Sequence, residues 1–308
     1  MSSKYFILIY TITFNPAIDY VVHTDDIVLD SINRSNHEEI YFGGKGINVS
    51  IVLNELGIES KALGFVAGFT GKAIEEGISK QGIETDFVHL EEGFSRINVK
   101  IKSNKETEIN GQGPKILDSD ILKLFQKLDA VQDDDIIILA GSIPNSLPSN
   151  IYEKIIEHLK PKKVRIVVDT TKDLLLNVLK YEPYLIKPNN FELEEIFGIK
   201  LNTIDEISKY ARKLKRMGAL NVLVSMAGDG ALLVDENNEI HICQAYKGLV
   251  KNSVGAGDSM VAGFIAGLLN GNYDYALKLG TASGGATAFS DGLATKDTIF
   301  QLLNQHIL

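Results

Sequence analysis

The middle of the chain alternates segments with helical spacing of apolar residues and short, continuous apolar runs. The spacing predicts helices near residues 149–159 and 204–217, and it is clearest in a stripe formed by Ile121, Leu122, Phe125 and Leu128. Short apolar runs between helices are typical of parallel strands that are covered on both faces. Here the runs are D-D-D-I-I-I-L-A (133–140), V-R-I-V-V-D-T (164–170), P-Y-L-I (183–186) and N-V-L-V-S-M (221–226). The pattern therefore predicts an α/β fold whose mostly parallel sheet is doubly wound by helices.

Polar clusters come at the ends of these runs. They are Gly141-Ser142, Asp169-Thr170, Lys187-Pro188-Asn189 and Ser225-Met226-Ala227-Gly228. In a doubly wound sheet the ligand crevice lies beyond the carboxyl ends of the strands. One such cluster would be an ordinary loop, but four at one edge of the sheet predict a binding site.

Two stretches interrupt the alternation, at about residues 15–41 and 95–113. The second, R-I-N-V-K-I-K-S-N-K-E-T-E-I-N, alternates apolar and polar residues in the way a half-exposed hairpin does. We expect both stretches to form a small β-sheet lid over the rim of the large sheet. The remaining residues, 1–14, 42–94 and 114–308, would form the α/β core, with a buried first strand preceded by an extension over residues 1–8.

Composition and charge narrow the class of protein. The 308 residues carry a formal net charge of -9 without any run of Lys or Arg, which argues against a nucleic-acid partner. No apolar stretch approaches the roughly 18 residues that cross a bilayer, so no membrane partner is expected. Cys243 is the only cysteine, which excludes an internal disulfide and favours a reducing compartment. We therefore expect a cytoplasmic protein, with Cys243 as a packed thiol in a strand.

The sequence N-S-V-G-A-G-D-S-M at 252–260 carries the strongest chemical signal. Apolar residues follow it at helical spacing, so the glycines stand where a loop enters a helix. Paired glycines there indicate a positive φ or a close approach of the backbone to a ligand. The free N–H groups at a helix amino terminus favour an anion. Asp258 is the unusual residue, because an acid inside an anion site needs a chemical reason.

Four other segments are ambiguous when each is taken alone. The glycine-rich Y-F-G-G-K-G-I-N-V-S (41–50) enters a helix, and such turns are more often structural than functional. Asp19 could be a turn acid, and A-G-D-G at 227–230 could simply turn a hairpin. Asn189 and Glu192 could be a helix cap with an acid in the first turn. The sequence has no G-x-x-x-x-G-K-[ST] phosphate loop. It also has no G-x-G-x-x-G after the first strand, and this second absence disfavours a dehydrogenase.

Taken together, these segments resemble one family. G-G-K-G-I-N-V-S near the start, N-x-x-E at 189–192, S-M-A-G-D-G at 225–230 and V-G-A-G-D-S near the end resemble, in order, the motifs of the ribokinase-like sugar kinases, in the phosphofructokinase B branch. The resemblance covers the chain from about Ile9 onward. Within the branch, T-x-x-P-A-I-D-Y, S-R-I-N-V-K, E-T-E-I-N-G-Q-G-P, A-G-S-I-P and K-P-N are most similar to bacterial 1-phosphofructokinases. Tagatose-6-phosphate kinases are close relatives.

The resemblance implies a three-layer ribokinase-like fold and transfer of the γ-phosphoryl group of ATP, with Mg²⁺, to D-fructose 1-phosphate. Tagatose 6-phosphate and fructose 6-phosphate are alternative acceptors, and a non-catalytic sugar-phosphate sensor on the same fold is a different class. Phosphoryl transfer depends on positioning and charge neutralisation, which backbone amides at a helix start can supply. Asp258 would then be the general base, beside an anion hole formed by Gly255, Ala256 and Gly257.

The resemblance also implies the remaining site residues. Sugar hydroxyls would be held by Asp19, Gly43, Gly44 and Asn48, and the acceptor phosphate by Arg96, with Lys45 and Ser142 assisting. The nucleotide would lie along Ser225, Gly228, Gly230, Gly257 and Ser283. Glu192, with Asn189 through water, would hold Mg²⁺. Lys187 could face either the nucleotide or the sugar phosphate.

A homodimer through the lid is expected from the same resemblance. The alternating strand at 96–102 would offer an edge for pairing, and Arg34 could reach across the interface. The lid itself would cover the sugar and exclude water.

Overall fold

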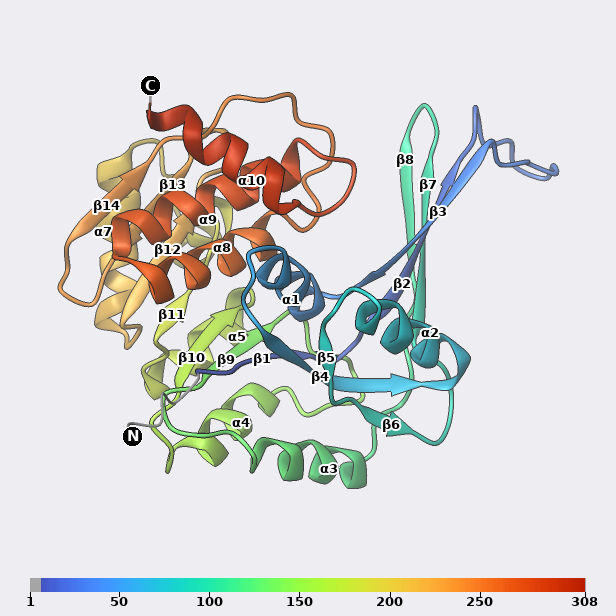
Figure 1. The fold of residues 1–308 in the computed structure, drawn as a ribbon, viewed down its shortest axis with the longest axis horizontal. Coiled ribbons are helices and arrows are strands. Elements are labelled where there is room, and N and C mark those ends of the chain that lie inside the picture. The colour runs from blue at the N-terminus through green and yellow to red at the C-terminus, as the bar shows by residue number, and fades with distance from the viewer. Residues whose placement is uncertain (1–6, 308) are drawn as a thin grey trace.

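A large twisted sheet lies between two layers of helices, and a smaller sheet projects from one end of it (Figure 1). The computed structural model describes residues 7–307, so the part of the predicted N-terminal extension before Ile7 lies outside the described residues. The order of the large sheet is β14-β13-β12-β11-β10-β9-β1-β4-β5, with β6 paired to β4. Only the β12–β13 and β13–β14 pairs are antiparallel. The strands are β1 Ile9–Thr13, β4 Ser60–Ala67, β5 Glu84–Thr85, β6 Val88–Leu90, β9 Ile136–Ala140, β10 Arg165–Asp169, β11 Leu185–Ile186, β12 Asn221–Ser225, β13 Ala231–Val234 and β14 Ile240–Cys243.

The apolar runs form strands because both faces of the sheet are covered. Ile137 packs in the cluster on one face, and its neighbour Ile138 packs in the cluster on the other. The helices of the first face are α3 Asp118–Leu128, α4 Ile151–Leu159, α5 Lys172–Val178, α6 Asn190–Phe197 and α7 Ile204–Arg216. Those of the second are α1 Lys45–Glu55, α8 Ala256–Asn270, α9 Tyr273–Ala288 and α10 Lys296–Leu303. The predicted doubly wound α/β class is confirmed.

Three details refine this picture. α2 Gly68–Ser79 packs in a third, smaller cluster between the large sheet and the small one. Cys243 is buried at the end of β14, as predicted for a packed thiol. Within residues 7–307, none of the helices combines the length and the apolar character needed to cross a bilayer.

The predicted stripe on α3 is wrong at Leu122. That side chain is 64% exposed, whereas Leu124 and Leu128 are fully buried. Residues four apart lie on one face of a helix, so Leu124 and Leu128 define the inner face and Leu122 lies outside it. Ile121 and Phe125 are partly buried at its margin.

The two stretches that interrupt the alternation form a four-stranded sheet of order β3-β2-β7-β8. β2 Ala17–His23 pairs in parallel with β7 Arg96–Lys102, and the outer strands β3 His37–Gly43 and β8 Glu106–Asn110 are antiparallel to their neighbours. The expectation that residues 96–102 offer an edge is therefore wrong, because β7 has a partner on each side. The division of the chain into a core and a lid stays a prediction.

Alternation gives the small sheet two unlike faces. The register places Asp19, Asn98 and Asn110 side by side on one face, and Tyr20, Val99 and Ile109 on the other. The first face borders a cleft at the edge of the large sheet, and the second is largely apolar.

Gly64 is required where β1 and β4 meet. Its φ is +145°, and a Cβ there would lie 1.9 Å from the carbonyl oxygen of Thr13, its partner in the ladder. We expect Gly64→Ala to lower the free energy of unfolding by about 2–4 kcal/mol, through overpacking and backbone strain. Urea unfolding measures the loss. Gly228→Ala is the control, since a Cβ at Gly228 would meet nothing within 4 Å; equal losses in both variants would contradict the argument.

Candidate active site

A cleft of about 410 Å³ lies where the polar face of the small sheet meets the amino end of α8 and the loops after β11 and β12. Its walls bring together most of the predicted site residues: Asp19, Gly44, Lys45, Asn48, Arg96, Lys187, Asn189, Glu192, Ser225, Gly255, Gly257 and Asp258. A second cavity of about 270 Å³ adjoins it and shares Gly44, Lys45 and Arg96 with it. The carboxyl ends of the parallel strands thus border two adjoining cavities, at the edge where the four polar clusters predicted a binding site.

The two glycines before Asp258 have different structural reasons. Gly255 is the N-cap of α8 and has a φ of 80°, a conformation that residues with a Cβ rarely adopt. A Cβ on Gly257 would lie 3.2 Å from Nζ of Lys187, so this glycine permits a close approach. The N–H of Ala256 donates to the carbonyl of Ser253 at 3.2 Å, so it is already engaged in this structure.

Asp258 lies in the first turn of α8 and is 4% exposed. Nδ2 of Asn48 donates to its Oδ2 at 2.8 Å, and Nζ of Lys45 lies 3.8 Å from its Oδ1. Burial raises the pKa of Asp258 to about 6; Lys45 and Asn48 oppose the shift, and the charge of Asp169 adds to it. A carboxylate with a pKa near neutrality suits a general base.

Asp169 belongs to this centre, although no role was predicted for it from the sequence. Its side chain is buried at the end of β10, with Oδ2 3.4 Å from Nζ of Lys45 and Oδ1 3.3 Å from Nζ of Lys187. Burial works to raise the pKa of Asp169, but the two lysines outweigh it, and the net pKa lies below the ordinary value. Its position directly after a strand, in a polar cluster on the rim, was the available signal.

The acceptor side of the cleft is formed by the small sheet. Oδ1 of Asp19 accepts a hydrogen bond from Nδ2 of Asn98 at 2.8 Å, and Oδ2 lies 3.4 Å from Nζ of Lys100. Gly43 lies beside this carboxylate, since a Cβ on it would lie 3.4 Å from Oδ2 of Asp19. Asn98 and Lys100 were not singled out from the sequence, where they look like ordinary residues of an alternating strand.

The adjoining cavity has the character of an anion pocket. It is lined by Arg96, Lys45 and Ser142 together with Thr13, Thr170 and Thr171. Nε of Arg96 donates to the carbonyl of Asn15 at 3.1 Å, which fixes the direction of the guanidinium group. Burial lowers the pKa of Arg96, and the charge of Asp19 opposes the shift; arginine nevertheless stays charged in proteins.

Asn189 and Glu192 form the helix cap that the sequence allowed as one alternative. The backbone N–H of Asn189 donates to Oε2 of Glu192, and the N–H of Glu192 donates to Oδ1 of Asn189, each at 2.8 Å. Both residues also border the cleft. Carboxylate and amide oxygens are the ligands that Mg²⁺ prefers, so this donor set fits that ion.

Three residues predicted for the nucleotide are not among those that line the cleft, and their contact with it stays a prediction. Ser283 is fully buried in α9, where its Oγ donates to the carbonyl of Leu279. Gly230 has a φ of 94°, and a Cβ there would lie 2.0 Å from the carbonyl oxygen of Cys243, so it serves the hairpin between β12 and β13. Gly228 is on the exposed 3-10 turn Ala227–Asp229 of that hairpin. The structure brings Ser225 to the cleft but not Ser283.

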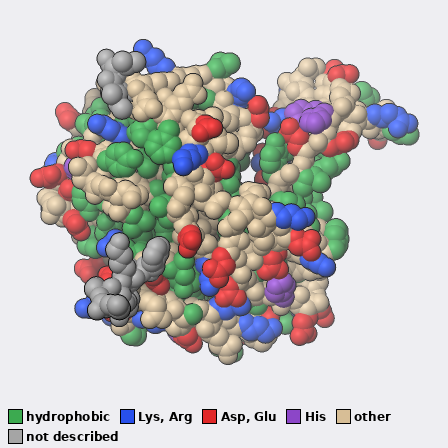
Figure 2. Space-filling model, in the orientation of Figure 1, with side chains coloured by type: hydrophobic (Ala, Val, Ile, Leu, Met, Phe, Trp, Pro, Cys, Tyr) green, Lys and Arg blue, Asp and Glu red, His purple; other side chains and the backbone are tan. Residues whose placement is uncertain are grey.

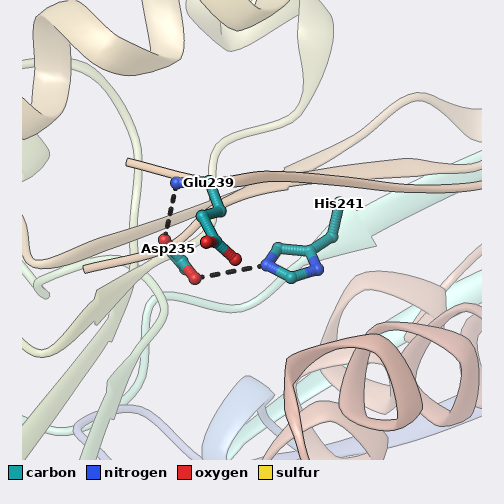
Figure 3. Close-up of side chains that lie close together, drawn as sticks. All are labelled: Asp235, Glu239 and His241. Atoms are coloured by element: carbon teal, nitrogen blue, oxygen red, sulfur yellow. Dashed lines mark hydrogen bonds and ion pairs between the residues drawn. The ribbon is translucent and has the colours of Figure 1, made fainter. Parts of the chain in front are cut away.

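A second cluster of possible metal ligands lies far along the sheet at the β13–β14 hairpin, where Asp235, Glu239 and His241 face one another (Figure 3). Oδ1 of Asp235 accepts hydrogen bonds from the N–H groups of Asn237 and Glu239, and its Oδ2 lies 3.2 Å from Nε2 of His241. Nδ1 of His241 lies 2.7 Å from Oδ1 of Asp274. These contacts account for the cluster as a tie between the hairpin and α9.

This tie should make stability depend on pH. Partial burial lowers the pKa of His241, but the hydrogen bonds to Asp274 and Asp235 outweigh it and raise the pKa above the ordinary value. The stabilisation is therefore complete below the unfolded-state pKa of about 6.5, and it is lost as pH rises through the folded-state value. Urea unfolding of wild type and His241→Gln at pH 5.5, 7 and 9 should show a gap that narrows with pH. A gap independent of pH would contradict the assignment.

Comparisons with known proteins agree with this geometry. Residues 10–299 match the pfkB family of carbohydrate kinases. The chain is 47% identical over 297 residues to the Bacillus subtilis protein named 1-phosphofructokinase, covering 96% of this chain and 97% of that one. It is 37% identical to the D-tagatose-1-phosphate kinase of Bacillus licheniformis, covering 97% and 98%. A candidate phosphofructokinase of Staphylococcus aureus, 43% identical, superimposes with a TM-score of 0.87 over 96% of this chain and 97% of that one. This chain belongs to the pfkB family of carbohydrate kinases.

Proposed function

We propose that this chain transfers the γ-phosphoryl group of ATP to D-fructose 1-phosphate, giving fructose 1,6-bisphosphate and ADP. The observation that carries the proposal is the pairing of two sites. The buried carboxylate of Asp258 lies in the cleft at the amino end of α8. A cationic cavity adjoins this cleft, and Lys45 and Arg96 line both. A kinase for an acceptor that already carries a phosphate needs both features. The name of the Bacillus subtilis relative supports the choice of acceptor.

Asp258 acts as the general base. It takes the proton of the acceptor hydroxyl as that oxygen bonds to the γ-phosphorus and the bond from phosphorus to the ADP oxygen breaks. Asn48 holds the carboxylate in place through the 2.8 Å hydrogen bond to Oδ2. Backbone amides at Gly255–Gly257 stabilise charge on the transferring group, since they lie at the amino end of a helix of 15 residues. Binding there requires Ala256 to exchange its bond to Ser253 for one to the phosphoryl oxygen.

The acceptor is held at two places. Arg96, Lys45 and Ser142 bind its phosphate in the adjoining cavity, and a guanidinium fork matches phosphate oxygens. Asp19, with Gly43, Gly44 and Asn48 beside it, binds the sugar hydroxyls from the small sheet and the start of α1. Because the two places are separate, the reacting hydroxyl must be at the end of the sugar away from the phosphate.

The nucleotide lies on the opposite side of Asp258, along Ser225, Asn189 and Gly257. Lys187 belongs to this side, because its Nζ would lie 3.2 Å from a Cβ on Gly257. Glu192, with Asn189 through water, would hold Mg²⁺, which neutralises phosphate charge when bound.

A coupled assay of ADP release with a panel of acceptors tests the proposal. The panel contains fructose 1-phosphate, tagatose 1-phosphate, fructose 6-phosphate, tagatose 6-phosphate and unphosphorylated fructose. We expect the highest kcat/KM for fructose 1-phosphate, and phosphorus NMR should identify the bisphosphate product. Binding of a sugar phosphate without any consumption of ATP would instead support a sensor.

D-Tagatose 1-phosphate is the second candidate acceptor. Its phosphate is at the same end as that of fructose 1-phosphate, and the two sugars differ only in configuration at one hydroxyl. The 37% identity to a D-tagatose-1-phosphate kinase over 97% of the chain favours including it. A higher kcat/KM for tagatose 1-phosphate than for fructose 1-phosphate would leave the proposed mechanism unchanged and make tagatose 1-phosphate the acceptor.

We further infer that two copies of the chain associate through the apolar face of the small sheet. The register places on this face Ile18, Tyr20, Val22, Ile40, Phe42, Ile97, Val99, Ile101 and Ile109. Ile18 and Phe42 pack toward α2, but Ile40 and Ile109 are 59% and 62% exposed. Figure 2 shows hydrophobic side chains gathered on the projecting sheet. A second copy would cover a surface that is costly to expose to water.

Light scattering after size exclusion tests this association. Wild type should have the mass of a dimer, and Ile40→Asp with Ile109→Asp should have that of a monomer. Leu122→Asp is a control, since Leu122 is a similarly exposed leucine on the distant helix α3. A monomeric wild type would contradict the inference. Arg34 lies in the exposed loop between β2 and β3, and its contact with a second copy stays a prediction.

A further inference from the structure

Asp169 forms ion pairs with both lysines of the cleft. Its side chain is 3% exposed, and that of Lys187 is 5% exposed, so this ion pair is shielded from water. Lys45 approaches the other carboxylate oxygen from α1, at 3.4 Å. Lys45 is 124 positions from Asp169 in the sequence, whereas Lys187 follows β11, the strand next to β10.

The two lysines face different parts of the centre. Lys45 lines both cavities and lies 3.8 Å from Oδ1 of Asp258. Nζ of Lys187 is close to the start of α8, since it would lie 3.2 Å from a Cβ on Gly257. One ammonium group is therefore directed to the acceptor and the other to the helix terminus.

We propose that Asp169 is a positioning residue of the phosphoryl transfer, which holds Lys45 at the acceptor side and Lys187 at the phosphoryl side of Asp258. The inference rests on the proposed function. It adds to it a role for Asp169, which the proposed mechanism did not include. Asp169 contacts neither substrate nor nucleotide in this role, and it acts through the two ammonium groups.

Asp169 and Asp258 compete for Lys45, and this competition explains why a carboxylate is needed at position 169. Without the charge of Asp169, the nearest carboxylate for Lys45 is Asp258, which already lies 3.8 Å away. Lys45 would then pair with the base and weaken it as a proton acceptor. A lysine side chain is long and flexible, with about 2 kcal/mol of rotamer entropy, so an anchor is required to keep it in one place. A preorganised charge also avoids reorganisation during the reaction.

The charges around Asp258 give the sign of the pH effect. Burial raises the pKa of Asp258, Lys45 and Lys187 lower it, the charge of Asp169 raises it, and the hydrogen bond from Asn48 lowers it. Glu192 acts on the same network through Lys45. Removing the charge of Asp169 takes away a raising contribution and frees Lys45 to approach Asp258. Both effects lower the pKa of the base.

Asp169→Asn, Lys45→Met and the double variant test the proposal. We expect Asp169→Asn to lower kcat by about 10²–10³-fold, the scale for losing a preorganised charge or donor. The acidic limb of the kcat–pH profile should move to lower pH. Lys45→Met should cost much less in the Asp169→Asn background than in wild type, because one side chain acts through the other.

Asp120→Asn is the matched control. Asp120 is also buried and paired with a lysine, Lys123, but it lies in α3. It should lower stability without changing kcat or the pH profile. Asp169→Asn alone could fail to fold, because it leaves two lysines without their buried partner. In that case the double variant, which removes one of these lysines, is compared with Lys45→Met.

Three results would overturn the proposal. The first is a kcat of Asp169→Asn within about twofold of wild type. The second is additive losses of kcat for Asp169→Asn and Lys45→Met. The third is rescue of Asp169→Asn by a higher Mg²⁺ concentration, which would make Asp169 a metal ligand. The wild type is assayed first with the whole acceptor panel. A wild type that prefers another acceptor refutes only the proposed substrate, and the variants are then compared with that acceptor.

Discussion

Replacing Asp258 with asparagine should lower kcat by about 10²–10⁴-fold, the usual contribution of a positioned general base. The amide has nearly the same shape but cannot take the proton of the acceptor hydroxyl. Asn48 donates to Oδ2 of the wild-type carboxylate, and the carbonyl oxygen of the new amide can still accept that bond. The fold should therefore be kept, and calorimetry should still detect binding of fructose 1-phosphate.

The same residue should set the acidic limb of the kcat–pH profile of wild type. Because burial raises the pKa of Asp258 to about 6, kcat should fall as pH drops below that region and the base becomes protonated. Above it the carboxylate is ionised and kcat should level off. Full turnover of Asp258→Asn, or a profile that is flat through pH 6, would remove Asp258 from the role of base.

Replacing Arg96 with methionine should raise the KM for fructose 1-phosphate by about 10–10²-fold, since a charged hydrogen bond contributes about 1.5–3 kcal/mol. The side chain lies in the adjoining cavity and is oriented by its bond to the carbonyl of Asn15. Methionine keeps much of the volume and removes the charge. The KM for ATP should change little, because the nucleotide is proposed to bind on the other side of Asp258.

Arg96→Lys is the second variant of this test. It keeps the charge but not the planar fork, so its KM should lie between those of wild type and Arg96→Met. Unphosphorylated fructose distinguishes loss of phosphate binding from general damage to the site. Any residual activity on this sugar should be the same in wild type, Arg96→Met and Arg96→Lys. An unchanged KM for fructose 1-phosphate in Arg96→Met would place the acceptor phosphate elsewhere.

The motifs located most of the cleft before the fold was known. A glycine pair before an acid predicted a loop entering a helix, and α8 begins at Ala256 with Gly255 at a positive φ. The polar clusters after the apolar runs predicted the rim, and Lys187, Asn189 and Ser225 all line the cleft. Such signals are local, because a turn, a cap or a strand end is specified by a few consecutive residues.

Relations between distant segments were not predictable from the sequence. Ser283 was expected at the nucleotide, but it faces α8, and a Cβ on Gly263 would lie 2.3 Å from its Oγ. Residues 96–102 were expected at an edge, but pairing with β2 and β8 places them inside the small sheet. Neither the neighbour across a helix pair nor the position of a strand in a sheet is encoded in local periodicity.

By itself, the sequence determined the α/β class, the positions of most strands and helices, and the residues that gather at the rim of the sheet. Only the tertiary structure decided the partnerships: Asn48 with Asp258 across 210 positions, and Lys45 with Asp169 across 124. It also decided that Asp258 is buried among these charges, with a pKa near neutrality. The physical reason is that hydrophobic spacing acts over a few residues, whereas burial and electrostatic interaction depend on distances in space that only the packed sheet and helices define.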